Sequence, residues 1–363
     1  MAILAVFLVG SNVRAQESFY KGKTIRFVVA TTAGGGFDAY TRTLARYLGK
    51  YIPGNPSIVV ENMPGAGHLI GANHMYKVAK PDGLTIGHFQ GGLFLHQLLG
   101  RPGIEFDARK FEFIGAPVTD NRACAFTKTS GITSVEKWQE SKGPAKLGGI
   151  GGGAPDDIAR MLAVTTSLPI QLVAGYKGTS EIRLAAESGE LAGGCWTWDS
   201  IRATWSKAID SGTAVVVLQI LAKPHPELPN VPLAINLAKS EEARQLIQVG
   251  IQEPSEYYRP YVFPPGTPKE RLQILRRAFQ DALKDSDLLA DAKKARLDIE
   301  PVPGEEMEKM VAALFKLDPR MIAEVIDPKG DSDEKILLAA RICPTKAISL
   351  EEEGTGKKIF PAG

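Results

Sequence analysis

Short apolar runs alternate with segments of helical spacing in the N-terminal part of the chain. Residues 24–30, 57–61 and 84–89 are apolar runs bounded by turn residues, and each predicts a strand. The segments between them place apolar residues three or four positions apart, as on one face of a helix; these residues are Tyr40, Leu44, Tyr47 and Leu48, then Leu69, Ala72, Tyr76 and Ala79. This alternation predicts parallel βαβ units and therefore an α/β fold.

A second series of the same kind begins near Asn121. Helices are expected to begin at Ser134 and at Pro155. The predicted strands of this series are residues 123–127, 146–150, 171–174, 191–195 and 214–220. The Pro-rich stretch 223–232 (KPHPELPNVP) then predicts a linker or a domain-crossing segment.

The pattern resumes after the Pro-rich stretch. Residues 257–263 predict a strand, and 305–316 predict a helix. Another helix is expected to begin at residues 267–270 (TPKE), a capping box with proline at the first helical position.

A chain of 363 residues exceeds the usual size of one domain, so two domains are expected. The later helices can pack on the first sheet and make the first domain discontinuous. We therefore expect domain 1 to comprise residues 19–119 plus 226–330, and domain 2 to comprise residues 120–225.

Composition narrows the choice of partner. The formal net charge is +2, with 44% hydrophobic and 23% charged residues, which is ordinary for a globular protein. No block of Lys and Arg is interleaved with aromatic residues, so nucleic acid is not an expected partner.

The N-terminus predicts export. Residues 3–9 (ILAVFLV) form an apolar run too short to span a bilayer, and Ala15 suits a cleavage site. No Lys or Arg precedes the run, so the predicted signal peptide, residues 1–15, is truncated or atypical. A buried N-terminal strand is the alternative. Export implies a periplasmic location.

Three cysteines, Cys124, Cys195 and Cys343, show no CxxC spacing. A disulfide between Cys124 and Cys195 is compatible with an oxidising compartment, and two separate buried thiols are the alternative.

Three glycine clusters follow predicted strands and precede predicted helices. Glycine lets the backbone approach a ligand, and the N-terminus of a helix attracts an anion, so such loops can hold a carboxylate without Arg or Lys. In open α/β sheets ligands bind at this end of the strands. One such cluster alone is more simply explained by a tight turn; three in equivalent positions favour binding. The candidate ligand-binding residues are Gly34, Gly35, Gly36, Phe37 and Asp38; Gly65, Ala66 and Gly67; and Gly152, Gly153 and Ala154.

Motifs of common enzyme classes are missing from the sequence. It contains no GxxxxGK[ST], no GxSxG and no HExxH, and the first glycine run lacks GxGxxG spacing. Among the histidines, His68 adjoins a glycine loop and is the one expected to face a ligand. We expect no enzymatic activity, no metal and no cofactor.

The acidic residues beside the glycine loops bear on what the cleft accepts. Asp38 suits the dipole of its helix, and it also has the place to orient water that binds a carboxylate. Asp156 and Asp157 lie in the first turn of the third loop's helix and partly neutralise its dipole. That end of the cleft is expected to meet a neutral or donor-bearing part of the ligand.

Two of the four tryptophans follow the predicted strand at 191–195. Trp196, Thr197 and Trp198 are candidate binding residues, because an indole offers both an apolar face and an N–H donor. Packing in the core is the alternative role for both indoles.

These segments together resemble a known family. Residues 20–30 (YKGKTIRFVVA), AGGGFD, 59–67 (VVENMPGAG) and 80–87 (KPDGLTIG) are similar to the substrate-binding proteins of tripartite tricarboxylate transporters, also called Bordetella uptake gene receptors. Residues 174–178 (AGYKG), 229–232 (PNVP) and 263–268 (FPPGTP) match further segments in the same order. The resemblance covers residues 19 to 330.

The resemblance implies a periplasmic Venus-flytrap fold, with two α/β domains joined by crossover strands. It implies capture of an organic carboxylate and delivery to membrane transporter subunits by a monomeric protein. The first two glycine loops would hold the carboxylate, with Asp38 matching the family's loop aspartate. The other end of the ligand would be selected by Gln90, Gly91, Tyr176 and the loops of the second domain, which would determine which groups that end can carry.

Departures from the family pattern change the expected ligand. His68 replaces a common Gly, residues 151–157 replace a run that ends near a His, and the tryptophan pair replaces Phe-Asp-Asn. We therefore expect one carboxylate on a sizeable apolar or aromatic body rather than a simple dicarboxylate. A ligand-sensing subunit for a receptor kinase is the alternative function.

The resemblance ends near Asp331. Residues 335–361 are similar instead to the C-terminal end of a bacterial ferredoxin, with a Cys-Pro and a TGxxIFP segment. A cluster needs three or four cysteine ligands, and this tail has only Cys343, so we expect no iron–sulfur cluster.

Overall fold

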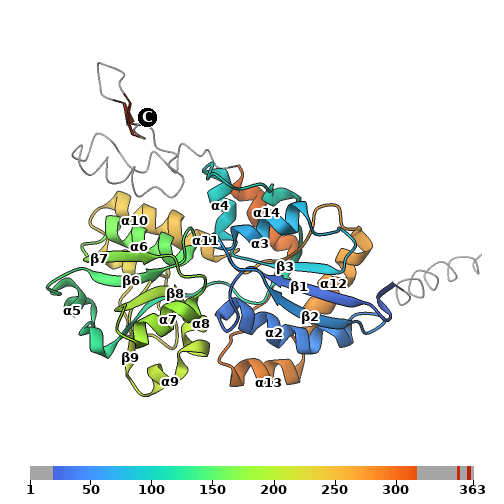
Figure 1. The fold of residues 1–363 in the computed structure, drawn as a ribbon, viewed down its shortest axis with the longest axis horizontal. Coiled ribbons are helices and arrows are strands. Elements are labelled where there is room, and N and C mark those ends of the chain that lie inside the picture. The colour runs from blue at the N-terminus through green and yellow to red at the C-terminus, as the bar shows by residue number, and fades with distance from the viewer. Residues whose placement is uncertain (1–18, 317–349, 352–357, 361–363) are drawn as a thin grey trace, which may run out of the picture.

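The computed structural model describes residues 19–316, 350–351 and 358–360, and it contains two mixed β-sheets, each covered by helices (Figure 1). The predicted signal peptide and Cys343 lie outside the described residues. We call the six-stranded sheet with its helices the first lobe, and the five-stranded sheet with its helices the second lobe. The α/β fold predicted from the pattern is confirmed.

The first sheet has the order β11-β4-β10-β3-β1-β2. Strand β1 pairs in parallel with β2 and β3, whereas β10 runs antiparallel to β3 and β4, and β11 antiparallel to β4. The strands are β1 (Thr24–Val29), β2 (Ser57–Asn62), β3 (Thr85–His88), β4 (Glu112–Ala116), β10 (Tyr261–Phe263) and β11 (Val302–Pro303). Segments far apart in sequence thus share one sheet.

Alternation along β1 divides the first-lobe core between the two faces of its sheet. Ile25 and Phe27 pack with α2 (Gly36–Leu48), α12 (Lys269–Ala282) and α13 (Ser286–Lys294). Val28 packs on the other side, with α3 (Leu69–Lys77), α4 (Gly92–Leu98) and α14 (Gly304–Leu314).

The second sheet has the order β7-β6-β8-β5-β9, with β6 parallel to β7 and β8, and β5 antiparallel to β8 and β9. Its strands are β5 (Arg122–Thr127), β6 (Ala145–Gly149), β7 (Ile170–Ala174), β8 (Gly193–Thr197) and β9 (Ala214–Gln219). The lobe's helices are α5 (Val135–Gln139), α6 (Ala154–Thr165), α7 (Thr179–Glu187), α8 (Trp198–Thr204), α9 (Ser206–Asp210) and α10 (Glu241–Ile247).

The remaining elements are short. They are the 3₁₀ helices Gly49–Tyr51, Ala108–Lys110, Lys128–Ser130 and Ala234–Leu237, the π-helical turn Gln248–Gln252, α11 (Glu253–Ser255), and the antiparallel pair β12 (Leu350–Glu351) and β13 (Lys358–Phe360). Ala234, Ile247 and Ile251 pack in the core of the second lobe. The domain boundaries stay a prediction.

Two local predictions need correction. The predicted strand at 257–263 is paired only over β10; Tyr257 packs in the core of the first lobe instead, and Tyr258 packs against the core of the second lobe. The capping box at Thr267 is wrong: its hydroxyl donates to the carbonyl oxygen of Pro264 at 2.9 Å, and Pro268 takes the N-cap position of α12. The hydroxyl is therefore engaged in the preceding turn.

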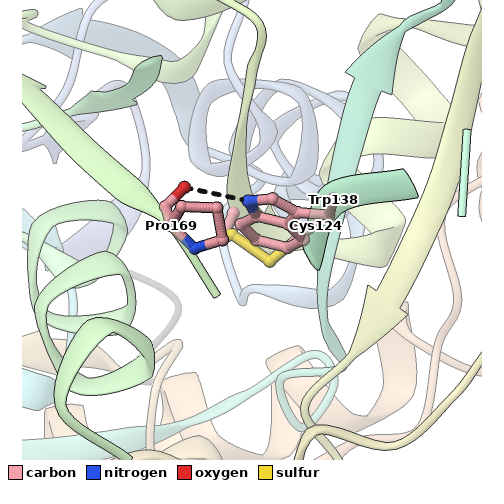
Figure 2. The surroundings of a disulfide bond; sticks show 4 residues. Cys124, Trp138 and Pro169 are labelled. Atoms are coloured by element: carbon pink, nitrogen blue, oxygen red, sulfur yellow. Dashed lines mark hydrogen bonds between the residues drawn. A yellow bond between two sulfur atoms is a disulfide. The ribbon is translucent and has the colours of Figure 1, made fainter. Parts of the chain in front are cut away.

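Cys124 and Cys195 form a disulfide between directly opposed positions of β5 and β8. Both residues are buried in one cluster with Trp138. Figure 2 shows Trp138 beside the disulfide, with its Nε1 donating to the carbonyl oxygen of Pro169 at 3.2 Å. Of the two alternatives for these cysteines, the structure has the disulfide.

Candidate functional site

A small cavity of about 30 Å³ lies between the lobes, where α2 begins and β8 ends. A water molecule needs roughly 10–15 Å³ of such space, so the cavity has the size of one small polar group. Its lining comes from both lobes: Thr31, Gly36, Phe37, His68, Ile150, Pro155, Thr179, Trp196, Thr197, Ser200 and Tyr258.

The first lobe contributes the N-terminus of α2. Gly35 is the N-cap residue, in an extended conformation, and no side chain caps the helix. The first N–H groups of a helix have no partner within it, so this end favours an acceptor or an anion. A Cβ on Gly36 would lie 1.7 Å from Ser200 Oγ, so only glycine allows α2 to approach α8 this closely.

Asp38 stabilises this loop and does not line the cavity. Its carboxylate accepts from Arg42 Nε, from Asn62 Nδ2 and from the backbone N–H of Gly34, at 2.9–3.0 Å. Burial raises the pKa of Asp38, but these hydrogen bonds outweigh it and leave the pKa below its usual value. The predicted water-orienting role stays a prediction.

The second glycine loop has positive φ angles at four successive residues, 138° at Gly65, 45° at Ala66, 60° at Gly67 and 72° at His68. The last is an unfavourable conformation for a residue with a side chain. His68 is nevertheless 5% exposed, packs edge-on to Phe37 and has no partner at Nδ1. Burial, aided by the charge of Arg259, lowers the pKa of His68 to about 3, so the ring is neutral at physiological pH.

Gln90 bridges the two lobes at the edge of the cavity. Its Nε2 donates to the carbonyl oxygen of Gly67 at 2.8 Å, and its Oε1 accepts from the backbone N–H of Ala154 at 2.9 Å. Arg101 Nη1 donates to the carbonyl oxygen of Gly152 at 2.6 Å. The glycine loops of the two lobes are in direct contact here, since a Cβ on Gly67 would lie 2.4 Å from the carbonyl carbon of Gly152.

The second lobe contributes side chains from the end of β8 and from α8. Trp196 is 3% exposed, and its indole N–H has no partner. Arg259, fully buried behind the cavity, donates through Nη2 to Thr197 Oγ1 at 2.6 Å and to Ser200 Oγ at 3.0 Å. Tyr258, which lines the cavity, donates to Gln90 Oε1 at 2.9 Å and so connects the lining with the side chain that bridges the lobes.

The predicted site residues divide into three groups. Those that line the cavity are Gly36, Phe37, His68, Trp196 and Thr197. Those in the loops immediately around it are Gly34, Gly35, Asp38, Gly65, Ala66, Gly67, Gln90, Gly91, Gly152, Gly153 and Ala154. Two lie elsewhere: Tyr176 donates to Glu190, and Trp198 lines a wider cavity on another side of the lobe junction.

That wider cavity, about 860 Å³, is bordered by several charged residues that pair with one another. Arg202 pairs with Asp298 at 2.7 Å and with Glu227 at 2.5 Å, and Arg296 pairs with Asp210. Trp198 Nε1 donates to Glu227 Oε2 at 2.9 Å. Arg202 Nε is the one buried polar side-chain atom without a partner in the described lining of this cavity, whereas His68 Nδ1 and Trp196 Nε1 lack partners in the lining of the small cavity.

The two aspartates of the third loop lie in different surroundings. Burial, together with the charge of Asp157, raises the pKa of Asp156. Asp157 instead lies 3.0 Å from His96 Nε2, and this contact outweighs burial and lowers its pKa. Neither carboxylate lines the small cavity.

The sequence-based site prediction missed six residues of the lining, which are Thr31, Ile150, Pro155, Thr179, Ser200 and Tyr258, and also Arg259 behind it. No glycine cluster or motif marks Thr179, Ser200, Tyr258 or Arg259. Among residues 19–316, no group of three or more His, Cys, Asp or Glu side chains could hold a metal ion.

Relatives of known sequence support the family resemblance. A UPF0065 protein of the gbd 5′ region of Cupriavidus necator is 25% identical over 307 residues, which cover 83% of this chain and 86% of the relative. A second UPF0065 protein, from Bordetella bronchiseptica, is 28% identical over 138 residues, or 38% of this chain and 40% of the relative. The chain is similar to the UPF0065 proteins over most of its length. No family model matches it.

Solved structures show the same fold as this chain. The periplasmic binding protein BugD aligns with a TM-score of 0.66 at 21% identity, covering 84% of this chain and 98% of BugD. MatC from Rhodopseudomonas palustris, solved with malate, gives 0.65 at 18% identity, covering 84% and 99%. Another R. palustris protein, solved with adipate, gives 0.64 at 19%, covering 84% and 97%. The chain therefore has the fold of a periplasmic binding protein.

Proposed function

We propose that this protein is a periplasmic solute-binding protein that captures an organic carboxylate between its lobes and delivers it to a tripartite tricarboxylate-type transporter. One observation carries the proposal: the uncapped N-terminus of α2 and the unpartnered indole N–H of Trp196 belong to the lining of one interlobe cavity. Both are hydrogen-bond donors, and a carboxylate supplies the acceptors that they lack.

The apolar part of the lining supports a ligand with an apolar body. Phe37, Ile150, Pro155 and Tyr258 surround the donors. The cavity of about 30 Å³ holds a carboxylate head but not the body of malate or adipate. The lobes therefore have to separate, or side chains have to move, before a whole ligand enters.

Contacts across the cleft support a closing motion. Gln90 and Arg101 of the first lobe bond to the backbone of the third glycine loop in the second lobe. These bonds exist only when the lobes meet, so they favour the closed form that a membrane partner would recognise. The solved neighbours are solute-binding proteins, which supports a binding rather than an enzymatic role.

Two observations support the proposed periplasmic location. BugD is described as a periplasmic binding protein, and the disulfide between Cys124 and Cys195 suits an oxidising compartment. Among the described residues, no helix has the length and apolar character needed to cross a membrane.

Titration calorimetry with six acids tests the function: acetate, butyrate, benzoate, succinate, malate and adipate. At least one should bind with a 1:1 stoichiometry, and butyrate or benzoate should bind more tightly than succinate, because the lining offers donors for one carboxylate and an apolar surface beyond it. No heat with any of the six acids would contradict the proposed function. Tighter binding of succinate than of benzoate and butyrate would contradict only the expected ligand.

A further inference from the structure

Ser200 lies where the two lobes meet most closely. It belongs to α8, is 3% exposed and lines the small cavity. Its Oγ lies 1.7 Å from the position that a Cβ on Gly36 would occupy, so the hydroxyl adjoins the first residue of α2. Any group held at the N-terminus of α2 is therefore within reach of Ser200.

The hydrogen bonds of Ser200 determine what its hydroxyl can still do. Its oxygen accepts from Thr197 Oγ1 at 2.6 Å and from Arg259 Nη2 at 3.0 Å. A hydroxyl has two acceptor lone pairs and one hydrogen to donate. Both lone pairs are thus occupied, and toward a ligand Ser200 can act only as a donor.

Arg259 brings a positive charge that its surroundings only partly balance. It is fully buried between the rings of Phe37 and Tyr40, with its guanidinium carbon 4.8 and 4.7 Å from their centres. Asp120 lies 3.6 Å from Arg259 but is 3.0 Å from Arg122, so one carboxylate serves two guanidinium groups.

Two further details support the surplus of positive charge. Asp199, the other buried carboxyl near Arg259, is paired with Arg202 at 3.1 Å, so its charge is not available to Arg259 alone. Arg259 Nε and Nη1 have no partners among the described residues. An anion in the adjacent cavity would offset this buried charge.

We propose that Ser200 is a ligand-binding residue that donates its hydroxyl hydrogen to the carboxylate held at the N-terminus of α2, with Arg259 as the positioning residue that fixes and polarises this hydroxyl. The inference rests on the proposed function and deepens it, because it assigns the second lobe a direct role in holding the carboxylate. The Ser200 hydroxyl should favour a carboxylate over the corresponding primary amide, because a donor next to a buried positive charge favours an anionic acceptor.

The substitution Ser200→Ala removes the donor together with the acceptor that Thr197 Oγ1 and Arg259 Nη2 use, while Arg259 keeps its hydrogen bond to Thr197 Oγ1. The probes are the six acids named above, together with butyramide and benzamide, titrated into the wild-type and variant proteins. For the acids that bind the wild type, Kd should rise about 10- to 100-fold, the range for one hydrogen bond to a charged group. Affinity for the amides should change less, so the preference for acid over amide should fall.

Ser211→Ala is the matched control, because Ser211 is an exposed serine of the same lobe, away from the cavity. Its Kd values should stay within about twofold of those of the wild type. A second variant, Arg259→Lys, keeps a positive charge but cannot hold both hydroxyls, and it should also reduce the preference for acid over amide. If this variant does not fold, Ser200→Ala alone decides the question.

The possible outcomes separate the two proposals. An unchanged Kd for every acid in Ser200→Ala, or an equal loss for acid and amide, overturns the role of Ser200 and leaves the proposed function standing. If none of the six acids binds the wild-type protein, the proposed function fails and the inference fails with it.

Discussion

The two walls of the cleft present hydrogen-bond donors by different means. The first lobe uses backbone: α2 begins at Gly36 without a side-chain cap, and the glycines allow close approach. The second lobe uses side chains: Trp196 and Ser200 line the cavity, and Arg259 lies behind them. Backbone N–H groups bind any carboxylate alike, whereas side chains favour a ligand whose other groups match their shape and chemistry. We therefore expect affinity to depend on the first wall and selectivity on the second.

The first prediction tests the close contact between α8 and the backbone wall, by which we mean the start of α2 at Gly36 and its glycine loop. Gly36→Ala places a Cβ against Ser200, and the lobes cannot then meet as they do here. Kd for the binding acids should rise at least about 100-fold, comparable to losing two charged hydrogen bonds. Calorimetry measures the change.

Gly151→Ala is the control for Gly36→Ala. Gly151 belongs to the third glycine loop, has no atom within 4 Å of an added Cβ and has no positive φ. Its Kd values should match those of the wild type. Equal losses in the two variants would show that glycine matters only for loop flexibility.

The second prediction concerns the side-chain wall. Trp196→Phe keeps an aromatic ring stacked on Trp205 but removes the indole N–H. Kd for the binding acids should rise about tenfold, the effect of one hydrogen bond to a charged group. The order of affinities among the six acids should also change, which Gly36→Ala should not cause. An unaltered order would contradict the assignment of selectivity to this wall.

The third prediction concerns the support of the backbone wall. Asp38→Asn weakens the hydrogen bonds to Arg42 and to the backbone N–H of Gly34, and should lower the free energy of unfolding by about 1 kcal/mol at pH 7. The folded-state pKa of Asp38 is below its unfolded value, so its stabilising contribution exists above the usual Asp pKa of about 4 and is lost as the pH falls below it.

Urea unfolding of wild type and Asp38→Asn between pH 7 and pH 3 measures this contribution. The difference between the two proteins should shrink toward the acid end. A difference that stays constant across this range would mean that the carboxylate charge contributes nothing.

The smallest expected effect on stability comes from His68→Gly. Glycine relieves the unfavourable φ of 72° but leaves a space where the ring was, and the free energy of unfolding should change by no more than about 1 kcal/mol. The enlarged cavity should bind adipate several-fold more tightly relative to acetate, as calorimetry can show. Because the pKa of His68 is about 3, the wild-type affinities should not respond to this group between pH 5 and pH 8.

The fold followed from the hydrophobic pattern because strands such as β1 and β2 contain short apolar runs, and amphipathic helices separate them. Two short elements escaped prediction: β4 has five residues, all buried, and α13 has nine, and both pack on distant parts of the chain. The turn at Thr267 followed the capping-box pattern but uses its hydroxyl differently.

The candidate site divides in the same way. The backbone wall could be predicted because glycine loops after strands are visible in sequence, and Gly36 and Phe37 do line the cavity. Ser200 and Arg259 could not be predicted, because they lie 59 positions apart and act together only through the hydrogen bond that the fold creates. Trp198, grouped with Trp196 by sequence, lies in another cavity because α8 begins at that residue and turns its side chain away.

A crystal structure with the most tightly binding of the six acids tests the central claim most directly. We predict the carboxylate oxygens within about 3.2 Å of the backbone N–H groups at the start of α2 and of Ser200 Oγ, with the remainder of the acid against Phe37 and Tyr258. A carboxylate bound in the wider cavity beside Trp198, or an apolar end of the ligand at the start of α2, would contradict the account.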